Sequence, residues 1–119
     1  CLNADGIHLG GYITPGLPLL SSVLNSCSGL NYHADNVTTI KQEFGVNTQG
    51  CMDAGINMMV VGFLKEAFAY AQKELATPFS VVCTGGDSAL VALALDDAMV
   101  EVDLVFTGLA IACPYKVGG

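Results

Sequence analysis

The sequence predicts an α/β fold in which helices alternate with short buried strands. Two observations lead to this prediction. Near the end of the chain, apolar segments at 79–83 and 100–106 are each followed by a glycine-containing turn and then by helical periodicity. Between residues 48 and 75, apolar side chains recur at steps of three and four, which is typical of one long amphipathic helix. The 119 residues suffice for one domain and are too few for two.

The composition excludes several classes of protein. Apolar residues make up 52% of the chain and charged residues 13%, a balance that excludes intrinsic disorder. The longest unbroken apolar runs, such as Ala89 to Leu95, stop at seven residues, whereas a membrane-spanning helix needs roughly 20. The net charge of −7, with only four scattered cationic side chains, predicts repulsion from a phosphate backbone. We therefore expect neither a membrane span nor nucleic acid binding.

The segment before residue 15 is expected to be a strand of a hairpin. Asp5-Gly6 is typical of a hairpin turn, and Ile7 to Thr14 partly alternates apolar and polar side chains. The partner of this strand should precede Asn3, so we expect the natural protein to begin before Cys1. Gly10-Gly11 inside the strand is compatible with a bulge, with a ligand that approaches closely, or with a helix packed on the strand.

A short amphipathic helix is expected after Pro15-Gly16. Leucine and valine recur at helical steps over Leu17 to Leu24, and Pro18 is tolerated there only in a first turn. Asn25 to Asp35 is rich in Ser, Asn and Gly, so it is predicted to be a surface loop. A weak helical pattern follows near Val37 to Glu43.

Gly45-Val46-Asn47-Thr48 leads into the longest periodic segment. The pattern predicts a helix from Thr48 to Leu75, with Asn47 or Thr48 as its N-cap and Thr77-Pro78 as its stop. Free N–H groups and the positive dipole end at its start are able to hold a carboxylate or phosphate beside the Thr48 hydroxyl. Plain capping explains the same residues. The apolar stripe consists of Met52, Ile56, Met59, Val60, Phe63, Ala67, Ala71 and Leu75.

Two units of strand, turn and helix are expected to complete the chain. The first apolar run has the character of a strand buried on both faces of a sheet. The expected elements are a strand over Phe79 to Cys83, a turn at Thr84-Gly85-Gly86-Asp87, a helix over Ser88 to Leu95, a strand over Val100 to Phe106, a turn at Thr107-Gly108 and a helical turn through Ala112.

Both predicted strands end in Thr-Gly, which marks a candidate ligand site. The carboxyl ends of strands line the ligand crevice of α/β sheets, and glycine lets the backbone approach a ligand closely. A tight turn from strand to helix needs the same residues as a ligand site. Neither Thr84-Gly85-Gly86 nor Thr107-Gly108 matches a dinucleotide fingerprint or a Walker motif, so the pattern alone leaves both interpretations open.

The remaining chemistry-bearing side chains predict no metal centre. The five cysteines have no CxxC spacing and fit small apolar side chains in a reducing cytoplasm. His8 and His33 stand alone and are interpreted as surface residues. Asp96-Asp97, with the Glu101 and Asp103 pair, indicates a solvated acidic rim. Asp87 is the carboxylate closest to a predicted ligand edge.

Taken in order, these segments resemble the C-terminal half of a type III pantothenate kinase. The resemblance covers nearly the whole chain, and four segments with these gaps between them are fairly specific. The closing segment, Ala110-Ile111-Ala112-Cys113-Pro114, is similar to the C-terminal tail of the proteobacterial members of this family. The four segments are Asp5-Gly6 with His8-Leu9-Gly10-Gly11-Tyr12-Ile13-Thr14-Pro15-Gly16, Gly45-Val46-Asn47-Thr48, Thr84-Gly85-Gly86-Asp87, and Asp103-Leu104-Val105-Phe106-Thr107-Gly108-Leu109.

The resemblance implies a fold and a reaction. The fold is that of the acetate and sugar kinase, Hsp70 and actin superfamily, in which two ribonuclease-H-like halves enclose a nucleotide. The reaction is phosphorylation of pantothenate by ATP, with Mg²⁺ and a monovalent cation, K⁺ or NH₄⁺, in a cytoplasmic homodimer. Thr48 matches a threonine that contacts pantothenate across the dimer interface, and the helix it opens would help to build that interface. Cys27 stands where some members have a histidine that contacts pantothenate. Thr84, Gly85 and Gly86 are the expected nucleotide-side residues.

The resemblance also implies that residues 1–119 are the C-terminal ribonuclease-H-like domain of a two-domain kinase. The family's phosphate loop, its catalytic segment and its cation-binding aspartate would precede Cys1. The chain's cations are Lys41, Lys65, Lys73 and Lys116. Because phosphoryl transfer needs cationic groups around the phosphates, we expect the isolated chain to be inactive. The alternatives are a noncatalytic accessory or regulatory module of kinase-like fold, and a kinase of the same superfamily that acts on a sugar or acetate.

Overall fold

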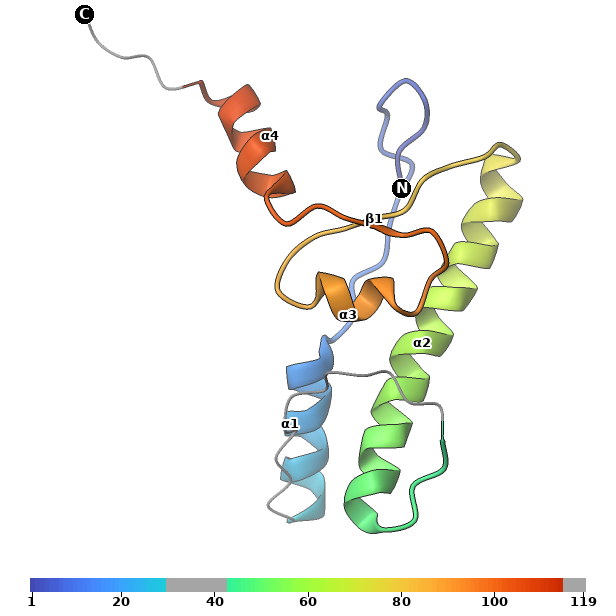
Figure 1. The fold of residues 1–119 in the computed structure, drawn as a ribbon, viewed down its shortest axis with the longest axis vertical. Coiled ribbons are helices and arrows are strands. Elements are labelled where there is room, and N and C mark those ends of the chain that lie inside the picture. Colours follow the sequence, from blue (N-terminus) through green and yellow to red (C-terminus); the bar gives the residue numbers. More distant parts are fainter. Residues whose placement is uncertain (30–42, 115–119) are drawn as a thin grey trace, which may run out of the picture. The chain divides into compact units, whose positions relative to one another are not determined.

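The computed structural model describes residues 1–29 and 43–114, in two compact units of residues 1–79 and 80–119 (Figure 1). The predicted pattern near Val37 to Glu43, and the predicted loop from residue 30 onward, lie almost wholly outside the described residues. No helix within the described ranges is long and apolar enough to cross a membrane. The elements are α1 (Leu17–Ser28), α2 (Thr48–Leu75), β1 (Val82–Cys83), α3 (Ser88–Ala92), β2 (Met99–Val100) and α4 (Leu104–Ala112).

The N-terminal turn lies where it is predicted, but the strand that follows it is shorter than predicted. Leu2 pairs with His8 in an isolated antiparallel bridge, and Gly6 adopts the positive φ of 75° that the turn requires. The Asn3 side chain accepts hydrogen bonds from the N–H groups of residues 5 and 7, at 3.0 and 2.9 Å. The prediction of a strand over Ile7 to Thr14 is wrong beyond His8, because Gly10 turns to a φ of 139° and interrupts the extended backbone.

Helix α1 begins as predicted and ends later than predicted. Gly16 is its N-cap, and a proline lies in its first turn, where a missing N–H costs least. The predicted loop from Asn25 is wrong for residues 25–28, which are helical. The Ser26 hydroxyl donates to the Ser22 carbonyl at 2.9 Å, within the helix. The helix ends where Gly29 adopts a left-handed conformation with a φ of 62°.

Helix α2 confirms the predicted bounds and the predicted N-cap. The Asn47 side chain accepts a hydrogen bond from the Gly50 N–H at 2.8 Å. At the other end, Ala76 adopts a left-handed conformation and closes the helix before Thr77-Pro78. Ile56 of the predicted apolar stripe is buried. Val61, which follows the stripe residue Val60, is also buried.

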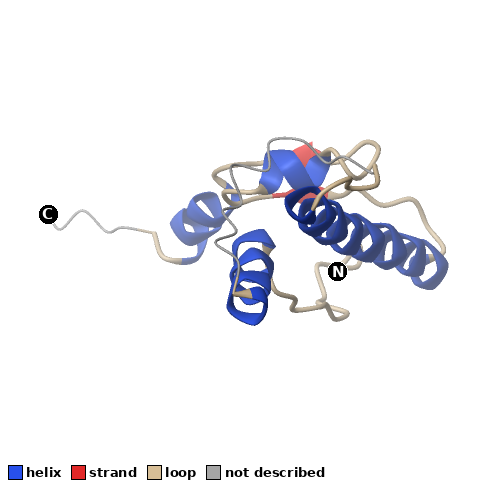
Figure 2. Cartoon of the chain, turned by 90° about the horizontal axis from the view of Figure 1, so that it is seen from below, coloured by secondary structure: helices blue, strands red, loops and turns tan. Residues whose placement is uncertain are grey.

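Helices α1 and α2 form the core of the N-terminal unit. They contact one another and run in opposite directions, and the view from below also places them side by side (Figures 1 and 2). Ile56 and Val61 are each 2% exposed, and Ser21 of α1 is buried. The Tyr12 ring meets the Phe63 ring edge-on at 5.8 Å, which ties the extended segment before α1 to α2.

The C-terminal unit is a parallel β–α–β arrangement. Strands β1 and β2 pair in parallel, with Val82 opposite Met99 and Cys83 opposite Val100, and α3 lies in the connection between them. The Glu101 N–H donates to the Cys83 carbonyl at 2.9 Å. A parallel pair joined through a helix is the predicted α/β arrangement.

The strands of this unit are shorter than predicted, and the second is displaced. The prediction of a strand over Val100 to Phe106 is wrong, since Leu104 to Phe106 belong to α4. The Thr107 N–H donates to the Asp103 carbonyl at 2.8 Å, the spacing of an α-helix. Thr107-Gly108 therefore lies inside a helix and not in a turn at a strand end. A short apolar run fits either element, and its periodicity does not separate them.

The Asn47 cap predicts a measurable contribution to stability. Replacement by alanine removes the acceptor of the Gly50 N–H, so Asn47→Ala should lower the free energy of unfolding by about 1 kcal/mol. Chemical denaturation followed by circular dichroism measures this change. Asn47→Asp keeps an acceptor oxygen and should stay within a few tenths of a kcal/mol of the parent. Equal stabilities of the two variants would contradict this role of Asn47.

Candidate functional site

The loop before α2 is pressed against the first turn of the helix. A Cβ atom on Gly45 would collide with the backbone of Gly50 and Cys51, so only glycine fits there. The Cys51 thiol donates to the Gly45 carbonyl at 3.3 Å. Together with the Asn47 cap, these contacts fix the path of the chain from residue 45 to residue 51. The start of α2 is thus a preformed structure on which Thr48 has a fixed position.

Thr48 combines three properties of a site for an anionic or hydroxyl-bearing ligand. It is exposed, and it is the first residue of a 28-residue helix whose dipole is positive at this end. The first turn of the helix contains no acidic residue that would neutralise this end. The next carboxylate along the helix, Asp53, accepts a hydrogen bond from the Gln49 side chain at 3.4 Å. The geometry can therefore hold a carboxylate or accept a hydrogen bond from a ligand hydroxyl.

Cys27 lies at the same end of the helix pair as Thr48. Cys27 is the penultimate residue of α1, Thr48 is the first residue of α2, and the two helices contact one another in opposite directions (Figure 1). Both residues are exposed. The structure thus brings the two predicted substrate-side residues to one end of the N-terminal unit.

Thr84, Gly85 and Gly86 form the turn after β1. Gly85 has a φ of 93°, a conformation that side chains with a Cβ rarely adopt, and its carbonyl accepts from the Ser88 N–H at 3.2 Å. The Thr84 hydroxyl donates to the Val102 carbonyl at 3.4 Å, which links the segments that follow the two parallel strands. All three turn residues are exposed. This turn lies at the carboxyl edge of the strand pair, as predicted.

Comparison with known proteins decides the family. Residues 1–70 match the family model described as type III pantothenate kinase. The chain belongs to this family. It is 41% identical over 118 residues to the type III pantothenate kinase of Ectopseudomonas mendocina, and 38% identical over 117 and 116 residues to those of Azotobacter vinelandii and Pseudomonas aeruginosa. These alignments cover 97%, 95% and 95% of this chain and 48%, 47% and 47% of the relatives.

The chain thus spans about half the length of the curated type III pantothenate kinases that it matches, and the matched part is their C-terminal portion. The family match over residues 1–70 contains Cys27 and Thr48. The turn at Thr84 to Gly86 lies beyond that match and within residues 80–119, which the alignments to the relatives include almost completely. The start of α2 therefore lies within the family match, and the turn after β1 lies in the part of the chain that the alignments to the relatives cover almost completely.

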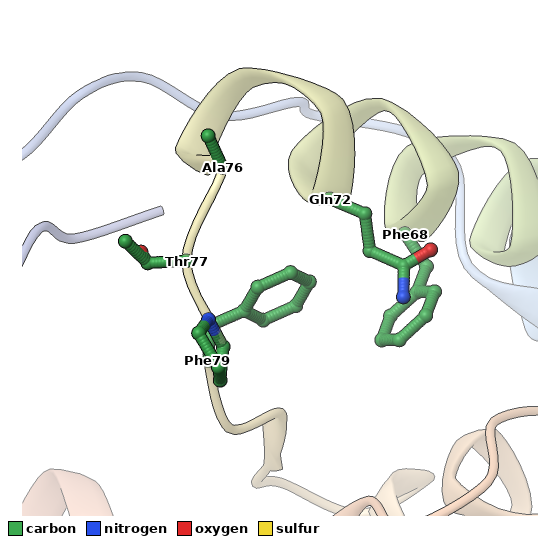
Figure 3. A pocket seen from close by; sticks show the side chains of 6 residues that line it. Phe68, Gln72, Ala76, Thr77 and Phe79 are labelled. Carbon is green, nitrogen blue, oxygen red and sulfur yellow. The ribbon is translucent and has the colours of Figure 1, made fainter.

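A hollow at the C-terminal end of α2 was not predicted from the sequence. Its volume is about 490 Å³ (Figure 3). The Phe68 and Phe79 rings lie 5.2 Å apart at 55° on its wall. An aromatic residue on each side of the Thr77-Pro78 stop is the signal in the sequence that could have indicated it. The hollow is lined by Phe68, Gln72, Ala76, Thr77, Pro78 and Phe79.

The cysteines depart from their predicted environment. Cys83 is buried, as expected of a small apolar side chain, whereas the other four cysteines are exposed free thiols, because they lie at the chain's first residue, on open helix faces or just after α4. In the part of the chain that the structure describes, no three His, Cys, Asp or Glu side chains gather where they could hold a metal ion. His8 is exposed beside the N-terminal turn, and His33 lies outside the described residues.

The space around Gly45 and Gly55 predicts opposite effects on stability when each is replaced by alanine. Gly45→Ala places a methyl group on the backbone of residues 50 and 51, so it should destabilise the chain by about 1–3 kcal/mol. Gly55→Ala, in the exposed interior of α2 with open space around it, should stabilise the chain by about 0.5–1 kcal/mol. Thermal unfolding of both variants measures the two shifts. A neutral Gly45→Ala variant would show that the loop is not pressed against the helix.

Proposed function

We propose that this chain is the acceptor-side half of a type III pantothenate kinase of the ribonuclease-H-like superfamily. The complete enzyme transfers the γ-phosphoryl group of ATP to the primary hydroxyl of pantothenate and forms 4′-phosphopantothenate, the first step of coenzyme A synthesis in the cytoplasm. The observation that carries the proposal is the family match over residues 1–70, which includes the preformed start of α2. The N-terminal domain of the enzyme is the segment that would precede residue 1.

Thr48 is proposed to hold pantothenate. Pantothenate carries a carboxylate and hydroxyl groups, and the positive end of α2 beside the Thr48 hydroxyl suits both. Two apolar side chains near Thr48, Phe44 and Val46, are 101% and 97% exposed. Such exposure next to a polar site supports a site that a neighbouring subunit completes and shields from water.

Cys27 is proposed to lie beside the same substrate and to contribute little to its affinity. A thiol is a weak donor and a weak acceptor, so it does not replace the hydrogen bond of an imidazole. The exposed position of Cys27, at the same end of the unit as Thr48, supports a place in the wall of the site. Substrate binding would then rest mainly on Thr48 and on residues of other parts of the enzyme.

The turn from Thr84 to Gly86 is proposed to form one wall of the nucleotide cleft. It lies at the carboxyl edge of a parallel strand pair, where α/β proteins bind ligands. Apart from Gly86 and its two chain neighbours, no heavy atom of the described residues lies within 4 Å of the position that a Cβ on Gly86 would take. A phosphate or an adenosine ring can therefore come close to this backbone.

The charges of phosphoryl transfer are proposed to be neutralised outside this chain. Catalysis of this reaction depends on positioning the phosphates and on surrounding them with metal ions and cationic side chains. The described residues offer only Lys65 and Lys73 as cationic side chains, both exposed on α2, and no cluster that fits Mg²⁺. We therefore assign Mg²⁺, the monovalent cation and the catalytic groups to the segment that precedes residue 1. This chain would position the acceptor.

Helix α2 is proposed to form the interface of a homodimer. Met58, Met59 and Tyr70 are 56%, 61% and 51% exposed on it, an apolar surface that favours contact with another protein. Methionine adapts its shape to a partner, which suits such a contact. The interface would bring the start of α2 of one subunit to the cleft of the other.

The assignment of the catalytic groups to the segment that precedes residue 1 predicts the outcome of a kinase assay. The full-length protein should phosphorylate pantothenate with ATP, and residues 1–119 alone should show no turnover above background. Formation of ADP in a coupled assay measures both. Turnover by the isolated chain would overturn the assignment of catalytic groups to the preceding segment. A full-length protein that binds pantothenate without phosphorylating it would instead indicate a noncatalytic accessory module.

The role of Thr48 predicts a loss of substrate affinity. Thr48→Ala in the full-length enzyme removes one hydrogen bond and should raise KM for pantothenate about 2- to 10-fold, the equivalent of roughly 0.5–1.5 kcal/mol. Thr48→Ser keeps the hydroxyl and is the matched control, with a KM close to that of the parent. Steady-state kinetics at saturating ATP gives both values. The role is wrong if the alanine and serine variants share one KM.

A further inference from the structure

Asp87 carries a carboxylate that does not cap the helix it precedes. It occupies the N-cap position of α3, where an aspartate side chain normally accepts a hydrogen bond from the first turn. Its φ of −94° and ψ of 7° differ from the extended backbone of a capping residue, and its side chain caps no N–H group in the described part of the chain. Asp87 is also exposed. Capping of α3 therefore does not account for this carboxylate.

Asp87 lies at the ligand edge of the C-terminal unit. Strand β1 leads directly into Thr84-Gly85-Gly86, and Asp87 closes this turn at the carboxyl edge of the parallel strand pair. The Thr84 hydroxyl donates its proton to the Val102 carbonyl at 3.4 Å, and the two glycines have no side chain. The Asp87 carboxylate is thus the strongest hydrogen-bond acceptor that the side chains of this turn offer to a ligand.

The charge of this unit disfavours phosphate at the turn. Every charged side chain between residues 80 and 114 is a carboxylate, and Asp103 directly follows Val102, the residue that Thr84 contacts. Carboxylates repel a diphosphate or triphosphate, and residues 80–114 contain no cationic side chain that offsets the repulsion. We therefore expect this turn to face the nucleoside part of a nucleotide and not its phosphates. The carboxylates are Asp87, Asp96, Asp97, Glu101 and Asp103.

The side chains near the turn favour the sugar of the nucleoside over its base. Residues 80–105 contain no aromatic side chain on which a purine ring could stack. A carboxylate has two oxygens that accept hydrogen bonds, and ribose carries two neighbouring hydroxyl groups that donate them. In other α/β folds, a carboxylate beside the carboxyl edge of the strands holds a ribose hydroxyl in this way.

We propose that the Asp87 carboxylate accepts hydrogen bonds from the ribose hydroxyl groups of the nucleotide. This inference rests on the proposed function, in which the turn after β1 forms one wall of the nucleotide cleft. It assigns the nucleoside end of the nucleotide to this turn and leaves the phosphates to the segment that precedes residue 1. Asp87 then contributes to specificity for a ribonucleotide and takes no part in the transfer of the phosphoryl group.

Nucleotide binding by the full-length protein tests this role without requiring turnover. ADP and 2′,3′-dideoxyADP differ only in the two ribose hydroxyl groups, so the ratio of their dissociation constants isolates the contacts to those groups. The parent protein should bind ADP about 5- to 20-fold more tightly than 2′,3′-dideoxyADP. In Asp87→Ala the ratio should fall to about 2 or less, because only ADP loses a hydrogen-bond partner. Ligand-observed NMR titrations measure both constants.

Asp96→Ala is the matched control for the loss of one negative charge. Asp96 is an exposed carboxylate of the same unit, and it precedes β2, whereas Asp87 follows β1. Asp96→Ala should therefore keep the ratio of the parent protein. Asp87→Asn keeps the size of the side chain and one acceptor oxygen, so its ratio should lie between those of the parent and Asp87→Ala. Asp87→Asn also tests the role of Asp87 if the alanine variant does not fold.

Three results would overturn the proposal. Equal affinity of the parent protein for both nucleotides, or an unchanged ratio in Asp87→Ala, would show that the carboxylate does not contact the ribose. Tighter binding of both nucleotides by Asp87→Ala would show that the carboxylate faces the phosphates. A protein that gives the expected ratios without phosphorylating pantothenate refutes the proposed function alone, and an active kinase whose ratio is unchanged in Asp87→Ala refutes the role of Asp87 alone.

Discussion

The hydrogen bond from the Gly50 N–H to the Asn47 side chain is the interaction on which the start of α2 depends. It determines the residue at which α2 begins, and the close contact of Gly45 with the first turn prevents the loop from moving away. The Thr48 hydroxyl and the positive end of the helix dipole are thereby held together at one place. The exposed hydroxyl and the helix end that are proposed to receive the substrate thus depend on a capping interaction that is itself purely structural.

Much of the fold could be predicted because its signals are local. Asn47, the apolar stripe of α2 and the Thr77-Pro78 stop each act within one or two turns of helix, so the sequence alone located α2 correctly. The Asp5-Gly6 turn and the first-turn proline of α1 are equally local. The candidate residues at the start of α2 and after β1 followed from these elements, since each stands where an element begins or ends.

The remaining features depend on contacts that a single sequence does not reveal. The run from Val100 to Phe106 is apolar enough for a buried strand, yet only its first residue pairs in the sheet and Asp103 opens a helix. Cys27 and Cys51 are exposed because the faces of α1 and α2 on which they lie stay open in this chain, which composition does not indicate. The hollow beside Phe68 and Phe79 arises only when the chain turns back after α2.

The position of the buried residues along α2 has a mechanical consequence. With a rise of 1.5 Å per residue, the midpoint between the buried residues Ile56 and Val61 lies about 16 Å from Thr48 and about 26 Å from Ala76. A tilt of α2 about this midpoint would move the C-terminal end of the helix about 1.7 times as far as its first turn. Thr48 therefore lies on the shorter side of this midpoint, where such a rotation would displace it less than the far end of α2.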